Sequence, residues 1–384
     1  MSNRKILIIS PDMAGGSYLS TLYSIEQSGL LQSTALITLK KIKERSRGLP
    51  VVGFNWYLDY RSIGPIMARN PLVSLIYNLP LYIITPMALA IFRPKVVISN
   101  GFLSGLMALL LAPALKIRFV LFHHGQFEFY IKPSILRFLK NGISKSIDFA
   151  VANSIGSKLD LANLIEENRI LIIEPYVRKS FFNLRDRMKI RIDFGLKDEL
   201  VVFYAGWLNK EKRCDKLLSL AQDYPQVHKV IFWFAGDGEL RDDIIKLSAN
   251  RPNVKYLGYI KDVEEIATRY TAADVSWSVA ETTYLARPAA ESLACGTPVI
   301  IPKSPGVLRR AEAGIKVPQS IVPSNIGWLV DDENISELSN LINDLVQRRV
   351  ANHMRTQCRS YAQLQSRTNN TAKLGTLLKM RAKI

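Results

Sequence analysis

Short runs of apolar, mostly β-branched residues recur along the whole chain, with amphipathic segments between them. Most runs hold four to seven apolar residues with little polar alternation. They are KILIIS, ALITLK, KVVISN, RFVLFHH, IDFAVANS and RILIIEP, followed by LVVFYAGW, VIFWFAG, VKYLGYI, VSWSVA, TPVIIP and IGWLVD. Such runs are typical of strands covered on both faces, and hence of parallel sheets with helices on either side. The sequence therefore predicts an α/β fold with two doubly wound, Rossmann-like domains.

The length fits this division. A chain of 384 residues with 48% apolar content can form two cores of about 150 to 200 residues each. The charged segment at 176–196 shows no clear period, so we expect the boundary there. We predict a first domain over 1–185, a second over 190–365, and a basic C-terminal helix over 366–384 that packs back on the first domain.

The most apolar segment, Pro71–Phe92, is nearly long enough to cross a bilayer. It contains three prolines and Asn78, so we predict a buried or membrane-touching helix pair rather than a span. The amino terminus predicts a first strand rather than a signal peptide, because its apolar run stops at Ser10 and Pro11.

The net charge of +18 is unevenly distributed. Residues 1–150 hold 17 Lys and Arg against 6 Asp and Glu, and the 39 residues from Val346 hold nine cations and no acid. This asymmetry indicates a polyanionic partner, either anionic lipid headgroups or nucleic acid, with a merely solvated basic surface as the alternative. The three cysteines are far apart, which suggests neither a zinc site nor a disulfide and fits a reducing cytosol.

Glycines follow several predicted strands. Gly15 and Gly16 follow the first strand, and Gly206, Gly236 and Gly258 follow three strands of the second half. Glycine lets the backbone approach a ligand closely, and doubly wound sheets bind ligands at the carboxyl ends of their strands. The pattern predicts ligand-binding turns, although a structural tight turn explains Gly15 and Gly16 equally well.

Charged and polar side chains accompany these turns. His123 and His124 end a strand, where they could hydrogen-bond a polar substrate or be satisfied core histidines. Lys210, Lys212 and Arg213 precede a predicted helix. Cations at a helix amino end oppose its dipole unless an anion binds there. We interpret this loop as a phosphate site.

The segment 280–302 predicts a loop over 281–287, a short helix over 288–295 and a stop at Gly296, since Pro288 and Gly296 flank the helix in the usual way. Glu291 lies in the first turn, where the helix dipole favours a carboxylate even without a function.

In this order the turns resemble those of the GT-B glycosyltransferases, specifically the retaining, nucleotide-sugar-dependent family 4. The match extends from ILIISPDMAGGSYL through IDFAVANSIGSKL, FAGDGEL and YLGYI to ESLACGTPVI and GWLV, of which the last group is the most specific. The resemblance implies two Rossmann-like domains that face each other across a cleft. The first domain would receive the acceptor, and the second would bind the nucleotide sugar.

The resemblance also assigns roles. Lys212 matches the lysine that contacts the donor diphosphate, His124 the histidine near the donor sugar, and Glu291 the second glutamate of an E-x7-E motif, which holds the ribose hydroxyls. From the resemblance and these turns together, we predict four catalytic residues, Lys212, His124, Glu281 and Arg287, and nine donor-binding residues, Gly15, Gly16, Gly206, Tyr259, Ile260, Thr283, Tyr284, Leu285 and Glu291.

Two positions depart from the family pattern. Thr283 stands where the first glutamate of E-x7-E is expected, and Glu281 lies two residues earlier. Trp207 stands where the family has an arginine, so one phosphate cation is missing. We hypothesise that Arg287 replaces it; the alternative is an arginine packed on the loop with its head in water.

The resemblance implies retention of the anomeric configuration. We expect no cofactor and no metal, because no Asp-x-Asp follows a strand and 331–333 (DDE) is predicted to be a surface turn. The basic, apolar-interleaved segments 39–49 and 127–145 suit an anionic bilayer. We therefore expect a lipid-linked or glycan acceptor and a cytoplasmic, peripheral membrane protein.

Other functions use the same framework. A nucleotide-sugar epimerase would need positioned acid and base carboxylates, and a phosphorylase a cofactor lysine; neither pattern is evident. A nucleic-acid-binding protein fits the charge, but no helix-turn-helix, zinc or RNA-recognition signature is present, so we expect no nucleic-acid partner. An inactive homologue is the remaining alternative, given Trp207 and Thr283.

Overall fold

A computed structural model of the chain describes residues 5–11, 16–39, 48–53, 71–123, 144–153, 155–162, 164–173, 177–225, 227–278, 286–302, 322–348, 350, 352–367 and 371–382. The chain divides into two compact units, Met1–Tyr176 with Asn369–Ile384, and Val177–Thr368. We call them the first unit and the second unit.

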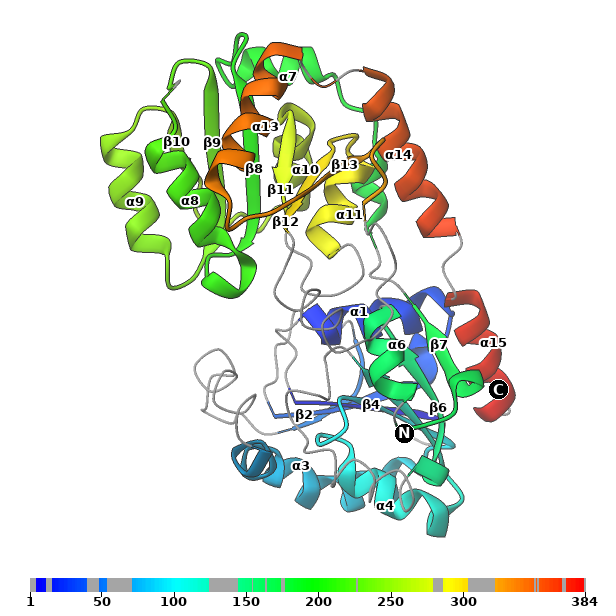
Figure 1. The fold of residues 1–384 in the computed structure, drawn as a ribbon. Coiled ribbons are helices and arrows are strands. Elements are labelled where there is room, and N and C mark those ends of the chain that lie inside the picture. Colours follow the sequence, from blue (N-terminus) through cyan, green and yellow to red (C-terminus); the bar gives the residue numbers. More distant parts are fainter. Residues whose placement is uncertain are drawn as a thin grey trace. The chain divides into compact units, whose positions relative to one another are not determined.

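The first unit contains a parallel sheet whose described strands number seven, in the order β3-β2-β1-β4-β5-β6-β7 (Figure 1). The strands are β1 (Ile6–Ser10), β2 (Thr34–Thr38), β3 (Val51–Gly53), β4 (Val96–Asn100), β5 (Arg118–His123), β6 (Ile147–Ala152) and β7 (Ile170–Ile172). The strand order reverses between β1 and β4, which is the switch point where such sheets bind ligands.

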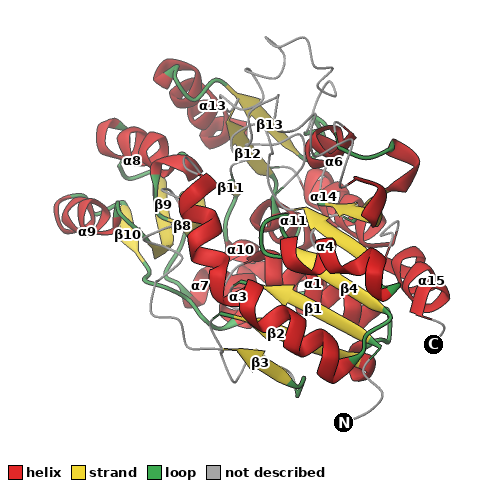
Figure 2. Cartoon of the chain, turned by 90° about the horizontal axis from the view of Figure 1, so that it is seen from below, coloured by secondary structure: helices red, strands yellow, loops and turns green. Residues whose placement is uncertain are grey.

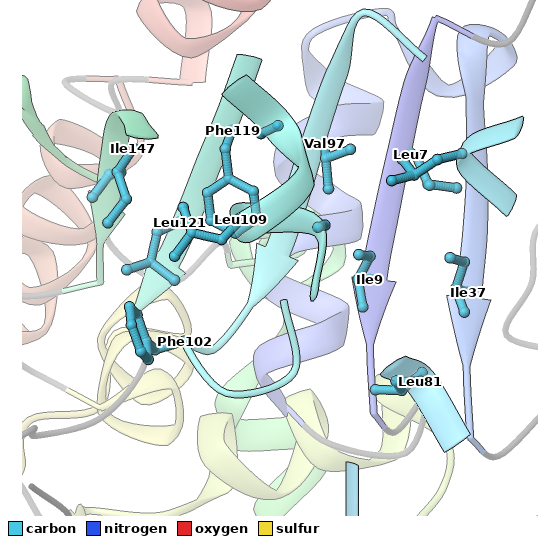
Figure 3. Close-up of a cluster of buried hydrophobic side chains, with 14 of the residues drawn as sticks. Leu7, Ile9, Ile37, Leu81, Val97, Phe102, Leu109, Phe119, Leu121 and Ile147 are labelled. Carbon is cyan, nitrogen blue, oxygen red and sulfur yellow. The ribbon is translucent and has the colours of Figure 1, made fainter. Parts of the chain in front are cut away.

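Apolar side chains on both faces of this sheet are buried, which explains the uninterrupted runs in the sequence. Leu7 and Ile9 of β1 point to one core, and Ile6 and Ile8 point to the other. Figure 3 shows Leu7 and Ile9 on the same face as Leu81 and other apolar side chains. Each face therefore needs its own layer of helices.

The described α-helices of the first unit are α1 (Gly16–Gln27), α3 (Pro71–Phe92), α4 (Leu106–Leu115), α6 (Ile155–Ala162) and α15 (Thr371–Ala382). α3 and α4 contribute buried residues to the core that contains Leu7, and α1 and α15 contribute to the opposite core. Within α3, the stretch Leu75–Phe92 is long and apolar enough to cross a membrane, although a core helix meets the same criterion.

The second unit has a parallel sheet of six described strands, ordered β10-β9-β8-β11-β12-β13. They are β8 (Leu200–Trp207), β9 (Val230–Asp237), β10 (Val254–Tyr256), β11 (Val275–Trp277), β12 (Val299–Pro302) and β13 (Gly327–Val330). The described α-helices are α7 (Arg187–Asp193), α8 (Cys214–Asp223), α9 (Arg241–Asn250), α10 (Val263–Ala272), α11 (Arg287–Ala294), α13 (Ile335–Arg348) and α14 (Asn352–Arg367). Here too β8 alternates, with Val201 facing one core and Val202 the other.

A cluster of arginines surrounds one carboxylate at the amino-terminal edge of this sheet. Asp274, which is 6% exposed and directly precedes β11, accepts hydrogen bonds from Arg187 (2.7 Å), Arg191 (3.1 Å) and the backbone N–H of Val201 (2.9 Å). Arg355 of α14 lies 3.6 Å from the same carboxylate, and burial lowers the pKa of Arg355 to about 10. The cluster ties α7 and α14 to the sheet.

The prediction of two doubly wound parallel sheets is confirmed, and Figure 2 shows strands of both sheets with helices beside them. Each predicted apolar run contains a strand. The prediction missed β3, which has only three residues. It also missed α7 inside the segment treated as irregular. Met188 and Ile192 of α7 are 68% and 71% exposed. Because these apolar side chains do not face the core, the helix lacks the amphipathic pattern that would have revealed it. Its sequence signal is Asp186, whose side chain accepts a hydrogen bond from the Lys189 N–H.

Candidate functional site

The second unit brings several predicted site residues to one edge of its sheet. Because all its strands are parallel, the turns after β8, β9 and β10 and the connection from β11 to α11 leave from the same edge. Gly206 in β8 pairs with Gly236 in β9, and the N–H of Gly236 donates to the Gly258 carbonyl at 2.9 Å. The three glycines therefore follow one another across adjacent strand ends.

Two positions in these turns must be glycine, because a side chain there would clash with the neighbouring backbone. Gly236 has φ +145°, and a Cβ there would lie 1.8 Å from the carbonyl oxygen of Gly206. Gly238 has φ +155°, and its Cβ would lie 2.4 Å from the carbonyl oxygen of Leu208. The loops after β8 and β9 thus rest directly on each other, which holds the backbone that precedes Lys212.

Lys212 lies on a short 3-10 helix, η7 (Lys210–Lys212), between β8 and α8. Its backbone N–H donates to the side-chain oxygen of Asn209 at 2.9 Å, and the N–H of Lys210 donates to Glu239 at 3.2 Å. The backbone of the turn is thereby fixed, and the Lys212 side chain is exposed. A rigid turn that presents an exposed ammonium group is suited to binding an anion.

Arg213 forms ion pairs within the second unit. Its guanidinium lies 3.3 Å from Asp332 and 3.1 Å from Glu333, and Lys216 pairs with Glu333 at 2.5 Å. The carboxylates that follow β13 therefore already balance the cations at the start of α8. The prediction that 331–333 form a surface turn is wrong for Asp332, which is fully buried, because it packs beside Arg213. Burial raises the pKa of Asp332, and the Arg213 charge opposes that rise.

Glu291 lies on α11, one turn after Arg287. The Arg287 Nε is 3.7 Å from a carboxylate oxygen of Glu291, whose side chain is 17% exposed while that of Arg287 is 41% exposed. Burial raises the pKa of Glu291, and the charges of Arg287 and Arg178 oppose that rise. A partly desolvated carboxylate on this helix is well placed to accept hydrogen bonds from hydroxyl groups.

The position of α11 is set at its carboxyl end by α14. Arg359 donates to the carbonyl of Cys295 at 3.1 Å, and Arg355 donates to the carbonyl of Gly296 at 3.3 Å. Gly296 has φ +81°, and a Cβ there would lie 2.9 Å from Arg359 Nε. Two guanidinium groups at the end of a helix complement its dipole. They hold the helix that carries Glu291.

Two predicted site residues follow β10: Tyr259, which is 63% exposed, and Ile260, which packs partly against the core. Trp207 ends β8 and is 44% exposed. It therefore occupies the edge where the resemblance expected an arginine. Whether Arg287 replaces that cation stays a prediction.

Other predicted site residues lie outside the described residues. These are Gly15, His124, Glu281, Thr283, Tyr284 and Leu285. Gly16 is described as the first residue of α1. The roles that the resemblance assigned to them stay predictions.

Sequence reasoning missed a polar network at the switch point of the first unit. The hydroxyl of Thr21 on α1 hydrogen-bonds Asn100 at the end of β4, and the Asn100 amide donates to the hydroxyl of Ser10 at the end of β1 (3.2 Å). All three are buried. The available signal was that two neighbouring strands each end in a buried polar residue.

Within the described ranges, no group of three or more His, Cys, Asp or Glu side chains is placed to hold a metal ion. The expectation of a metal-free reaction is not tested by this observation and stays a prediction.

Comparison with known proteins finds a family match within the second unit. Residues 186–365 match the family described as glycosyl transferases group 1. The alpha-monoglucosyldiacylglycerol synthase of Streptococcus pneumoniae is 28% identical over 230 residues, a match that covers 52% of this chain and 50% of that enzyme. A GDP-mannose-dependent alpha-(1-6)-phosphatidylinositol dimannoside mannosyltransferase of Mycobacterium tuberculosis is 27% identical over 130 residues, or 33% of each chain. The chain thus spans half the length of the first of these relatives, and less of the second.

Solved structures share the fold over the whole chain. The Anabaena protein HepE in complex with UDP superposes with a TM-score of 0.72 at 17% identity, covering 99% of both chains. A sucrose-phosphate synthase from Thermosynechococcus elongatus gives the same TM-score at 17% identity over 98% of both. The fold is therefore GT-B, as the sequence resemblance predicted.

Proposed function

Since residues 186–365 match the glycosyl transferases group 1 family, we propose that the chain transfers a sugar from a nucleoside diphosphate sugar to an acceptor hydroxyl. The observation that carries the proposal is the placing of Lys212 and Glu291 after β8 and β11, the two strands that flank the switch point of the second sheet. Glycosyl donors have two parts that suit these side chains: a diphosphate for the ammonium group and a ribose diol for the carboxylate.

The chemistry follows from these charges. The bond between the anomeric carbon and the diphosphate oxygen breaks while the acceptor oxygen bonds to the same carbon. Negative charge grows on the leaving diphosphate, and a preorganised cation stabilises it. We propose that Lys212 provides this charge on its fixed turn. In a retaining reaction the leaving phosphate oxygen accepts the acceptor proton on the same face of the sugar, so no protein base is required, and we propose that no metal takes part.

We assign Arg287 the second cationic role. It begins α11, is 41% exposed, and lies beside Glu291 rather than buried in the core. A phosphate near the start of α11 would meet both this guanidinium and the amino end of the helix. The Arg287→Ala variant should therefore raise the donor KM and lower kcat. Intact donor affinity and turnover in this variant, alongside losses in Lys212→Ala, would remove Arg287 from the mechanism.

We propose a lipid-linked acceptor. The names of the two relatives place a glucosyldiacylglycerol and a phosphatidylinositol dimannoside among the lipids those enzymes make or act on. The excess of eleven positive charges in residues 1–150 fits attraction to an anionic membrane. The chain would then work as a peripheral protein on the cytoplasmic face of a membrane.

The first test is a screen of nucleotide sugars by thermal stabilisation, since a ligand at 100 times its dissociation constant adds about 2.7 kcal/mol to the stability. The stabilising donor is then incubated with membrane lipid extract, and the products are separated. The proposal expects a glycolipid whose anomeric configuration matches the donor, formed at the same rate with EDTA. A donor that is only epimerised or hydrolysed would contradict transfer.

A further inference from the structure

The helix α3 has an outer face that is entirely apolar where it is described. The inner face of α3 packs in the core of the first unit, where its buried residues are Tyr77, Leu81, Ile84, Ala88 and Leu89. The residues of α3 described as exposed are Leu72, Ile76, Leu79, Ile83, Pro86, Met87, Ala90 and Ile91. We call this set the outer face of α3.

This face forms a continuous stripe. Six of its side chains, Leu72, Ile76, Leu79, Ile83, Met87 and Ile91, are between 53% and 62% exposed. They recur every three or four residues, which places them on one side of the helix. A helix of 22 residues is about 33 Å long. Single exposed apolar residues are ordinary on a protein surface, whereas a contiguous stripe of this length marks a contact site.

The neighbouring helix extends the surface. Figure 1 shows α3 and α4 next to each other on one side of the first sheet, and the two helices are in contact. On α4, Leu110 is 56% exposed and Leu115 is 51% exposed. The two helices together present aliphatic side chains and few groups that could form hydrogen bonds.

Cations border this surface. Residues 71–123 contain no Asp or Glu. Arg93 and Lys95 follow α3, Lys116 follows α4, and all three are exposed. Since α3 leads directly into β4 and α4 into β5, and the two strands are parallel neighbours, both helices end at the same edge of the sheet. The positive charges therefore gather at one end of the apolar face.

An anionic bilayer fits these features better than a second copy of the chain. Acyl chains solvate aliphatic side chains without requiring hydrogen bonds, and anionic headgroups neutralise lysine and arginine at the same depth. An isologous dimer through this face would bring the cations of both copies to one interface that lacks carboxylates from 71–123. The face also lacks the exposed aromatic residues that are enriched at protein interfaces.

We propose that the outer face of α3, with the exposed end of α4, lies in the boundary between the headgroups and acyl chains of an anionic membrane. α3 does not cross the bilayer, because its inner face packs on β2 and α4 within the core. The inference deepens the proposed function and rests on it in one respect, the use of a lipid acceptor. It would place the first unit directly on the surface that contains such acceptors.

The test measures vesicle binding without any sugar donor. The triple variant Ile76→Ser, Ile83→Ser, Met87→Ser changes only exposed side chains, so the fold should be retained; Ile245→Ser, which alters an exposed isoleucine of the second unit (39% exposed), is the control. With vesicles of phosphatidylglycerol and phosphatidylcholine, we expect the triple variant to lose at least tenfold in partition coefficient and the control to match the wild type. Vesicles of phosphatidylcholine alone should bind the wild type much less. Equal binding of the triple variant and the wild type would overturn the proposal.

A second measurement does not depend on the triple variant folding. Cys214, Cys295 and Cys358 are all buried, so a cysteine introduced as Ile83→Cys can be labelled selectively with a polarity-sensitive fluorophore. Its emission should shift to the blue when anionic vesicles are added, whereas a label at Ile245→Cys should not respond. An unchanged emission at position 83 would show that the face does not contact lipid. So would a dimer, detected by light scattering, that the triple variant abolishes while vesicle binding persists. If the wild type transfers sugar but does not bind vesicles, this inference alone is overturned. If it binds vesicles but transfers no sugar, only the proposed function is overturned.

Discussion

The two units share one sheet topology but stabilise it with different chemistry. In the second unit, ion pairs join the elements around the sheet: Asp274 holds three arginines, and Arg213 is held by Asp332 and Glu333. In the first unit, the switch point is joined by the neutral side chains of Ser10, Thr21 and Asn100, and the outer helix face is apolar. The apolar strand pattern, which both units share, is therefore enough for the topology. The units differ in the polar and charged groups that surround this shared topology.

The largest effect should come from the arginine cluster of the second unit. Asp274→Ala removes the carboxylate that faces Arg191, which is 6% exposed, and leaves a buried guanidinium uncompensated. Breaking such a pair costs about 3–5 kcal/mol. Urea unfolding should show this loss. Glu264→Gln is the control. Glu264 pairs with Arg185, but the Glu264 side chain is 56% exposed, and such surface pairs contribute about 0–1 kcal/mol. Equal losses in both variants would contradict the account of the cluster.

A second variant tests the packing of the strand ends. Gly236→Ala would place a Cβ 1.8 Å from the Gly206 carbonyl, so the turns after β8 and β9 must separate. We expect a loss of about 1–3 kcal/mol from backbone strain alone, together with weaker donor binding. Gly195→Ala also has a positive φ, +66°, but no atom lies within 4 Å of its Cβ; it should be destabilised without any change in donor affinity. Unchanged donor binding by Gly236→Ala would show that this edge is not the donor site.

The neutral network of the first unit should tolerate substitution better than the cluster around Asp274. Asn100→Ala leaves the buried hydroxyls of Ser10 and Thr21 without the hydrogen bonds they share with the amide. Removing one partner of a buried hydrogen bond costs about 1–3 kcal/mol. Chemical unfolding measured beside Asp274→Ala would rank the two. A larger loss for Asn100→Ala would reverse the comparison between the units.

The smallest change in stability is expected for Glu291→Gln, and it is a gain rather than a loss. Burial raises the pKa of Glu291 in the folded state, so the folded chain favours the protonated form. Its contribution to stability is therefore complete below the unfolded pKa and declines as pH rises through the folded pKa. Glu291→Gln cannot ionise, so it should gain stability relative to the wild type as the pH rises from 4 to 7. A variant that loses stability relative to the wild type over this range would show that Arg287 and Arg178 outweigh burial.

Much of the fold follows from local sequence, and much of the site does not. Each apolar run became a strand because both sheet faces are covered, and Gly296 ended α11 as expected. Asp332 was misjudged because its burial depends on Arg213, which lies far away in the sequence. The network of Asn100 with Thr21 likewise depends on two segments that meet only in the fold. The apolar run of α3 was visible in the sequence, but only the structure separates its buried face from its exposed one.

The central claim is that one edge of the second sheet holds the nucleotide sugar. Calorimetric titration with the donor found in the stabilisation screen tests it directly, using Lys212→Ala, Glu291→Gln and, as a control, Lys246→Ala, which removes an exposed lysine of α9. We predict that the first two variants lose at least tenfold in affinity, a difference of about 1.4 kcal/mol, and that the control binds like the wild type. Wild-type affinity in both Lys212→Ala and Glu291→Gln would contradict the claim.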